Sequence, residues 1–122
     1  MRRVTLDQFR AELVGQGVGH ADFAFKCPMC GTVQSARDLI AAGAGKSFDE
    51  VEKYIAFSCV GRWTGAPAPR TKPDGKPCNW TLGGLFSLHK LVVVTPDEKE
   101  HPRFEPASPE EAQAHANRAE AA

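Results

Sequence analysis

The stretch Lys26-Cys27-Pro28-Met29-Cys30-Gly31 holds two cysteines separated by two residues, a spacing that suits two thiolates on one metal ion. The proline after Cys27 and the glycine after Cys30 favour a tight turn, because glycine readily adopts the positive φ at which the chain turns back. Backbone N–H groups in such a turn point at the sulfurs and offset their negative charge. The stretch therefore predicts a metal-binding knuckle from which the chain returns as a strand.

The other two cysteines do not form a second close pair. Cys59 ends a predicted strand and Cys78 immediately precedes another, so adjacent strands can bring both sulfurs to the same ion. Closed sites of four sulfurs are usually structural rather than catalytic. We therefore predict one structural Zn²⁺ held by the four cysteines of the chain, Cys27, Cys30, Cys59 and Cys78.

Three alternatives to this zinc site stay open. The Cys-x-x-Cys pair could be a thioredoxin-like redox pair, although such a pair usually opens a helix. Cys59 and Cys78 could form a disulfide, which a reducing compartment disfavours. His20 or His89 could replace one cysteine as a ligand, but a lone histidine is more often a surface or packed residue.

The composition indicates one compact domain with short tails. The chain has 122 residues, of which 42% are hydrophobic and 25% charged, and 15 basic residues balance 15 acidic ones. This balance excludes a global field that would draw the protein onto nucleic acid or an acidic membrane. The N-terminus has no apolar signal-peptide core, and no stretch has the roughly 20 apolar residues that span a bilayer. We expect a cytoplasmic protein.

The predicted fold class is α+β, a small zinc-ribbon-like domain with a short antiparallel sheet, an N-terminal helix and two short helices. Capping signals for helices, including one C-terminal helix, stand at Thr5, Ser35, Ser47 and Ser108. The strand candidates are residues 22–26, 32–34, 56–59, 79–82 and 88–95.

Three segments are expected along the chain. Residues 1–19 form the N-terminal helix and a glycine-rich linker, and residues 20–107 form the zinc-binding domain. Residues 108–122 form an alanine-rich helix that lacks large apolar side chains, so it frays or awaits a partner and leaves room for a homodimer.

A basic loop, residues 61–77, lies between the last two cysteines. Tryptophan and arginine are common at binding hot spots, and zinc ligands at both ends of the loop would reduce the entropy that it loses on binding. We predict a partner-binding surface made of Arg62, Trp63, Arg70, Lys72 and Lys76. In the alternative interpretation Trp63 and Trp80 cover the zinc site, while the cations only keep the loop soluble.

The stretch from Gly43 to Ser47 resembles the end of a phosphate-binding P-loop. The full motif requires a glycine where Ile40 stands and a strand before the loop, whereas the preceding residues predict a helix. Glycines that end one helix and a serine that caps the next explain these residues better. We find no nucleophile–base arrangement and predict no catalytic residue.

Four motifs together carry a family resemblance. They run over residues 27–31 (CPMCG), 57–62 (FSCVGR), 78–86 (CNWTLGGLF) and 104–107 (FEPA). In these motifs the chain resembles a small family of uncharacterised bacteriophage and prophage zinc-knuckle proteins, over residues 20–107. The resemblance implies a phage accessory product, located in the host cytoplasm, and no activity to transfer.

The leading functional hypothesis is therefore a non-enzymatic phage-type accessory protein, stabilised by structural zinc, that binds a host macromolecule. By analogy with other small phage proteins, we expect it to inhibit an antiviral defence complex, as anti-CRISPR proteins do. A host or phage protein complex is the expected partner; nucleic acid would bind weakly, and a membrane is not expected. The alternative is a nucleic-acid-binding zinc-ribbon module, and an enzyme of unknown class comes third.

Overall fold

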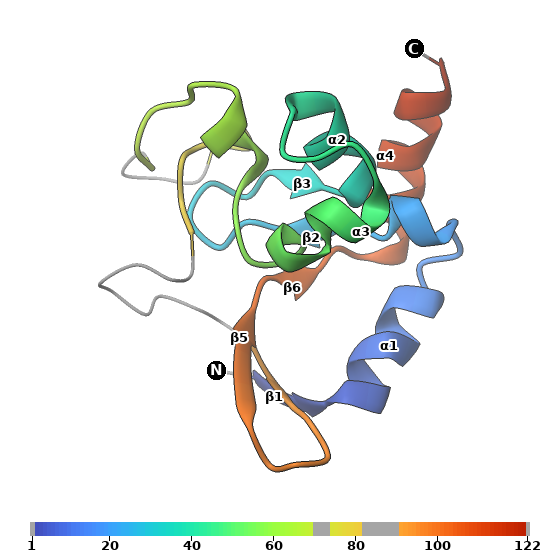
Figure 1. The fold of residues 1–122 in the computed structure, drawn as a ribbon. Helices are drawn as coiled ribbons and strands as arrows, with labels where there is room; N and C mark the ends of the chain where they lie inside the picture. Colours follow the sequence, from blue (N-terminus) through green and yellow to red (C-terminus); the bar gives the residue numbers. More distant parts are fainter. Residues whose placement is uncertain (1, 70–73, 82–90, 122) are drawn as a thin grey trace.

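The computed structural model describes residues 2–69, 74–81 and 91–121 of the chain, which form an α+β fold (Figure 1). Its elements are β1 (Arg2–Thr5), α1 (Leu6–Val14), the 3₁₀ helix η1 (His20–Asp22), β2 (Phe25–Lys26), β3 (Val33–Gln34), α2 (Ala36–Ala42), α3 (Phe48–Val51), the 3₁₀ helices η2 (Glu52–Tyr54) and η3 (Val60–Trp63), β4 (Leu91–Val94), β5 (Glu100–Arg103), β6 (Glu105–Pro106) and α4 (Pro109–Ala121). The predicted fold class is confirmed.

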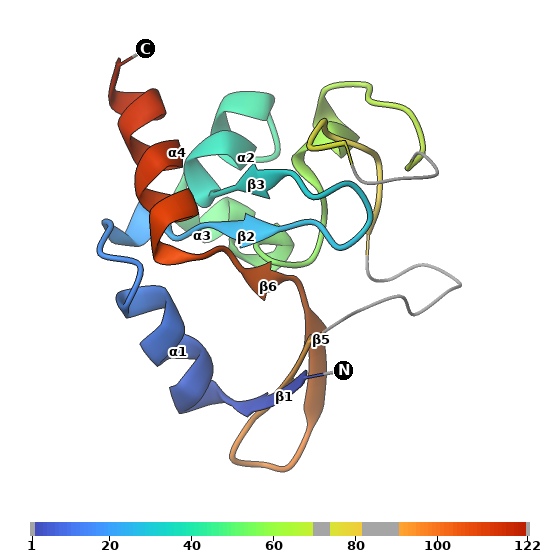
Figure 2. The same ribbon diagram turned by 180° about the vertical axis from the view of Figure 1, so that it is seen from behind.

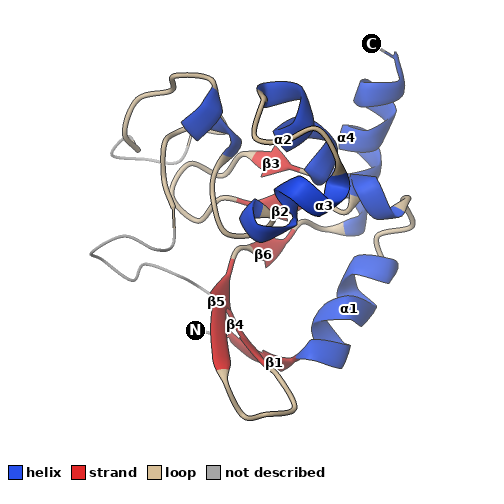
Figure 3. Cartoon of the chain, viewed as in Figure 1, coloured by secondary structure: helices blue, strands red, loops and turns tan. Residues whose placement is uncertain are grey.

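The strands form two three-stranded sheets, with the orders β1-β4-β5 and β3-β2-β6 (Figure 3). The second sheet is antiparallel, as predicted, but in the first sheet β1 runs parallel to β4, with Val4 beside Val93. The expectation of a single antiparallel sheet is therefore wrong. Residues 2–5 give no strand signal of their own, and they become a strand because the apolar β4 is paired on both sides.

The two sheets occupy different ends of the molecule and are joined by Phe104. Both views place β1 and β5 beside α1 at one end, and β2, β3 and α4 at the other (Figures 1 and 2). Phe104 lies between β5 and β6, is 1% exposed, and packs in the same cluster as the four cysteines. Its N–H donates to the carbonyl of Ala56 at 2.7 Å. The chain thus enters the cysteine-bearing end through a buried aromatic anchor.

The four α-helices begin directly after the predicted caps Thr5, Ser35, Ser47 and Ser108. In α1, Thr5 Oγ1 accepts the N–H of Gln8 at 3.1 Å, and the Gln8 side chain accepts the N–H of Thr5 at 2.9 Å. Such reciprocal bonds satisfy two backbone donors that the first turn of a helix leaves free. The helix starts are therefore determined locally.

Helix α4 finds its packing partner within the chain. Ala112 is fully buried and packs with Ala24 and Ala107, and the Gln113 amide donates to the carbonyl of Gln16 at 2.9 Å. Methyl side chains let the helix approach the β2 segment closely, so the lack of large apolar residues does not leave it unattached.

The buried side chain of Gln16 joins three segments. Its Oε1 accepts the N–H of Ala24 at 2.9 Å, and its Nε2 donates to the carbonyls of Ala24 at 2.8 Å and Ala107 at 3.0 Å. A buried amide is stable only when its polar atoms are paired in this way. Gln16 therefore fixes the end of α1 against β2 and the start of α4.

The strands predicted over residues 56–59 and 79–82 are wrong for the described part, which has only an isolated bridge between Ser58 and Thr81. Ala56 has a positive φ of 58°, and the N–H groups of Phe57 and Ser58 both donate to the carbonyl of Tyr54, so the chain turns here. The strand predicted over residues 22–26 is shortened to β2, because residues 20–22 form η1. Residue 82 of the strand predicted over 79–82, and residues 88–90 of the strand predicted over 88–95, lie outside the described residues.

Candidate metal centre

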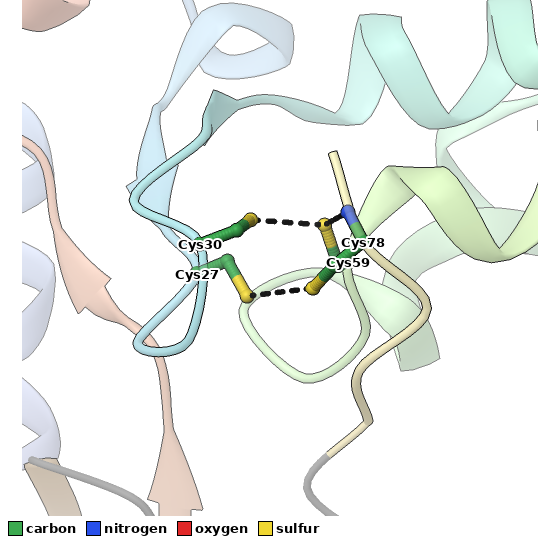
Figure 4. Close-up of side chains that lie close together, drawn as sticks. All are labelled: Cys27, Cys30, Cys59 and Cys78. Atoms are coloured by element: carbon green, nitrogen blue, oxygen red, sulfur yellow. Dashed lines mark hydrogen bonds between the residues drawn. The ribbon is translucent and has the colours of Figure 1, made fainter. Parts of the chain in front are cut away.

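The four cysteine sulfurs converge on one buried point. They come from the turn between β2 and β3 and from two later loop segments (Figure 4), and all four sulfurs lie within 4.8 Å of one another. The Cys27 and Cys78 sulfurs are 3.8 Å apart, as are those of Cys30 and Cys59. Four sulfurs at about 2.3 Å from a central ion, at the corners of a regular tetrahedron, are about 3.8 Å apart. The cysteines are therefore positioned to bind a metal ion.

The first pair sits in the predicted knuckle. The N–H of Cys27 donates to the carbonyl of Thr32 at 3.1 Å, and the N–H of Gly31 donates to the carbonyl of Cys27 at 2.9 Å. Gly31 has a φ of 79°, the left-handed conformation that the sequence predicts for it. Antiparallel strands β2 and β3 leave the turn on either side, so local sequence sets the spacing of this pair.

The second pair depends on a close approach of two loops. The N–H of Cys59 donates to the carbonyl of Trp80 at 2.9 Å, and the N–H of Cys78 donates to the Cys59 sulfur at 3.5 Å. A Cβ at Gly61 would lie 2.3 Å from the carbonyl oxygen of Cys78, so no larger residue fits there without a shift. Gly61 thus permits the contact that brings Cys59 and Cys78 together.

Two polar side chains that the sequence analysis missed support the sulfurs. The buried Gln34 donates from Nε2 to the Cys59 sulfur at 3.6 Å and accepts the N–H of Val60 through Oε1 at 2.7 Å. Thr32 Oγ1 lies 3.1 Å from the Cys30 sulfur. Such outer contacts orient ligands and offset their charge. The sequence signal that could have identified them is their position within three residues after the knuckle.

The hydrogen bonds and burial make the pKa values of the Cys27, Cys59 and Cys78 thiols unequal. A hydrogen bond from Cys27, together with N–H donors at Cys78 and Gly61 and the Gln34 amide, lowers the pKa of Cys59 to about 4. The same Cys27–Cys59 hydrogen bond and burial raise the pKa of Cys27, and burial raises the pKa of Cys78 to about 12. The protein thus stabilises the Cys59 thiolate, whereas Cys27 and Cys78 need a nearby cation before they ionise with it.

The alternative ligand and pairing schemes find no support in the described residues. The His20 ring is tilted against Phe48 at 4.3 Å and meets Phe23 edge-on at 5.4 Å between ring centroids, and it does not belong to the group of converging ligand atoms. His89 lies outside the described residues. None of the four cysteines forms a disulfide.

The basic loop lies only partly within the described residues, and its described Arg62 and Trp63 side chains contact other parts of the chain. Arg70 and Lys72 lie outside the described residues, whereas Lys76 is exposed. Arg62 donates to the carbonyl of Asn79 at 3.1 Å, and Trp63 packs edge-on against Tyr54, with ring centroids 4.7 Å apart.

The two tryptophans differ in what they cover. Trp80 packs against the cluster that contains the four cysteines, whereas Trp63 packs in a separate cluster with Leu39 and Val51. The alternative interpretation, in which both tryptophans cover the site, is therefore wrong for Trp63, and of the two only Trp80 packs against the cysteine cluster.

The glycine-rich stretch around Lys46 joins two helices. Gly43 ends α2 with a φ of 94°, and the Ser47 hydroxyl caps α3 by accepting the N–H of Glu50. This confirms the interpretation as a helix end followed by a helix cap, because the helix α2, and not the strand that a P-loop requires, stands directly before the stretch.

A comparison with known protein families matches residues 5–107 to the VVA0879-like family. The chain belongs to this family. The matched region of this VVA0879-like protein contains all four cysteines, the knuckle and Gly61. Curated proteins gave no match, and neither did solved structures. Within the part of the chain that the structure describes, no helix combines the length and apolar character needed to cross a bilayer.

Proposed function

We propose that the metal held by the four cysteines is a structural Zn²⁺. Each cysteine is at most 1% exposed, and four sulfur ligands complete a tetrahedron without an open position for substrate. Soft thiolates favour zinc over the hard cations magnesium and calcium. Bound zinc would supply the positive charge that four thiolates need and would join the knuckle to both ends of the 61–77 loop.

The zinc assignment is tested by elemental analysis of protein purified without chelator. We expect about one zinc per chain, which is the stoichiometry of a single closed site. The Cys59→Ser variant should lose the metal. The control variant Ala114→Ser introduces serine at a position remote from the site and should retain the metal. Less than half an equivalent of zinc in the unmodified chain would overturn the proposal.

We further propose that this protein is a non-enzymatic phage-type accessory protein that binds a host protein complex and inhibits antiviral defence. The observation that supports a binding role best is a hollow of about 370 Å³ beside the second cysteine pair. We call it the aromatic–basic surface; its lining residues are Lys53, Tyr54, Phe57, Ser58, Arg62, Trp63 and Thr81.

The chemistry of the aromatic–basic surface favours an acidic protein partner. Among its described lining residues two are cations and none is acidic. The Lys53 ammonium lies 5.1 Å from the centre of the Tyr54 ring, so charge and apolar area are presented together. Aromatic and arginine side chains dominate protein-binding hot spots, and charge complementarity steers the encounter. The neighbouring zinc would hold this surface in place before binding, which reduces the entropy cost.

The inhibition of defence is tested in bacteria that carry CRISPR-type interference against a plaque-forming phage. We expect the wild-type chain to restore plaques and the Lys53→Glu variant to fail, since charge reversal opposes an acidic partner. The matched control is Lys46→Glu, an exposed lysine outside this surface, which should act as the wild type does. No restoration by the wild type, or equal restoration by both variants, would contradict the proposal.

A nucleic-acid partner would give a different result. In gel shifts it would produce tight binding at moderate salt, weakened by Lys53→Glu, with an affinity that falls steeply as salt rises. The balanced net charge and the small number of described cations on this surface predict weak retardation instead. Tight DNA or RNA binding would therefore replace the protein partner with a nucleic-acid-binding module.

A further inference from the structure

A second concave site lies on the other side of η2, between α1 and the cysteine-bearing end. It is a cavity of about 540 Å³ lined by fourteen described residues, most of them apolar, and it shares none of them with the aromatic–basic surface. Its walls include Phe9 and Leu13 from α1, Phe25 from β2, and Phe48 and Ile55 from the opposite side. Cavities of this size and composition accept small organic ligands.

Two arginines line this cavity, and the less exposed of them is Arg103, at the end of β5. Its side chain is half-buried, and burial lowers its pKa. Its guanidinium donates to the carbonyl of Pro102 at 2.6 Å and lies 5.5 Å from the centre of the Phe57 ring. In residues 2–69, 74–81 and 91–121, no carboxylate forms an ion pair with it.

Three other arginines of the chain are paired with carboxylates. Arg2 pairs with Glu12, Arg3 with Glu100, and Arg37 with Asp22, although each of these three is more exposed to water than Arg103. A partly desolvated cation gains more from an anion than an exposed one does, because water screens it less. Arg103 is therefore the least exposed of the arginines that the structure describes, and it has no acidic partner among the described residues.

The remaining charges at the cavity leave it cationic. Arg10 also lines it, and Glu52 is the one carboxylate among its described lining residues. A guanidinium binds a carboxylate through two parallel hydrogen bonds, while the phenyl rings favour an apolar chain. The cavity thus combines an apolar body with a cationic edge.

We propose that this cavity binds a small amphiphilic carboxylate, whose apolar chain packs among Phe9, Phe25 and Ile55 while its carboxylate pairs with Arg103. The site is separate from the metal centre and does not rest on the proposed partner binding. The concave volume favours a small molecule over a protein segment, which would also require a long open groove.

Calorimetric titration of the zinc-loaded full chain with decanoate, and with decanol as the uncharged molecule of equal chain length, tests this proposal. We expect one saturable decanoate site per chain, with decanol about tenfold to a hundredfold weaker, the ratio that a hydrogen-bonded charge contributes. Arg103→Met should lower decanoate affinity to that of decanol and leave decanol binding unchanged. Arg103→Lys should retain much of the preference for the carboxylate.

The control variant is Arg62→Met, which removes a guanidinium outside the cavity and should bind decanoate as the wild type does. Unchanged decanol binding by Arg103→Met shows that the cavity is intact, so a folding defect cannot imitate the expected result. Equal affinity for decanoate and decanol, or equal decanoate affinity in Arg103→Met and Arg62→Met, would overturn the proposal. Tight binding of an acidic, phenylalanine-containing peptide without decanoate binding would also overturn it, in favour of a protein segment.

Discussion

The two ends of this molecule are ordered by different interactions. In the β1-β4-β5 sheet, the central strand pairs along four residues with each neighbour, and Leu91, Val92 and Val93 are buried. In the β3-β2-β6 sheet, each strand has only two residues, and the four cysteines lie beside it. Two-residue strands contribute little pairing energy by themselves. One end therefore depends on strand pairing and apolar burial, and the other on its sulfurs.

Metal removal should give the largest effect and should separate the two ends. Structural zinc contributes apparent free energies of about 10–16 kcal/mol in small zinc domains, comparable with the whole stability of a typical protein. After chelation, we expect backbone amides of β2 and β3 to lose hydrogen-exchange protection, while those of β4 retain more. Zinc addition should restore the wild type but not Cys59→Ser. Unchanged protection at β2 and β3 in the metal-free chain would contradict the view that the two ends are stabilised by different interactions.

The Leu91→Ala substitution should weaken the strand-paired end and leave the metal content at wild-type level. Leu91 is fully buried in β4, and a cavity at such a position costs about 2–5 kcal/mol. Urea unfolding measures the loss, and elemental analysis measures the zinc. Val14→Ala is the matched control, because Val14 is 69% exposed and its truncation should change stability by about 0.5 kcal/mol or less. Zinc loss in Leu91→Ala would show that the ends are not separable.

The Gly61→Ala substitution should weaken the cysteine-bearing end alone. The added Cβ would lie 2.3 Å from the Cys78 carbonyl oxygen, so the two ligand-bearing loops must separate. We expect a cost of about 1–3 kcal/mol, the usual range for overpacking, seen as lower zinc affinity in competition with a chelator. Gly19→Ala is the control, since its nearest atom would be 3.9 Å away. Equal zinc affinities in the two variants would refute the proposed role of Gly61 in the close approach of the Cys59 and Cys78 loops.

The smallest expected effect concerns the attachment of α4 to β2. The Lys26 ammonium lies 2.8 Å from the Glu111 carboxylate, and hydrogen bonds from Lys26 and Ser108 lower the pKa of Glu111. Because the folded pKa is the lower one, this stabilisation is present above the unfolded carboxyl pKa of about 4.3 and is lost as the pH falls through the folded value.

Glu111→Gln should therefore reduce stability by about 0.2–1 kcal/mol near neutral pH, the range of exposed ion pairs, and by less in acid. Urea unfolding at both pH values measures this difference. Glu110→Gln, an exposed neighbour in the same first turn, is the control and should show a smaller change. A Glu111→Gln defect of equal size at neutral and acid pH would rule out the ion pair as its cause.

Local features were predictable and distant pairings were not. The Thr5, Ser35, Ser47 and Ser108 caps were found from sequence because their partners lie three residues away. Strands β1, β5 and β6 were missed. Strands β1 and β6 acquire their partners from distant segments, whereas β5 pairs with the nearby β4 but has the sequence Glu-His-Pro-Arg, which gives no strand signal. The strand predicted over 56–59 failed because a β-type composition does not reveal the positive φ of Ala56. Sequence patterns indicate which face of an element is apolar and where the chain turns, but not which distant strands pair.

The sequence by itself determined the knuckle, the helix starts and the α+β class, because these depend on residues close together in the chain. Only the tertiary structure decided how Cys59 and Cys78 reach the knuckle, that Gln34 supports Cys59, and that Arg103 lines a mostly apolar cavity without an ion-pair partner among the described residues. These features join segments that are tens of residues apart, and side-chain chemistry alone does not specify which distant segments meet. The group of four cysteines therefore begins as a local Cys-x-x-Cys motif and is completed by the packing of distant segments.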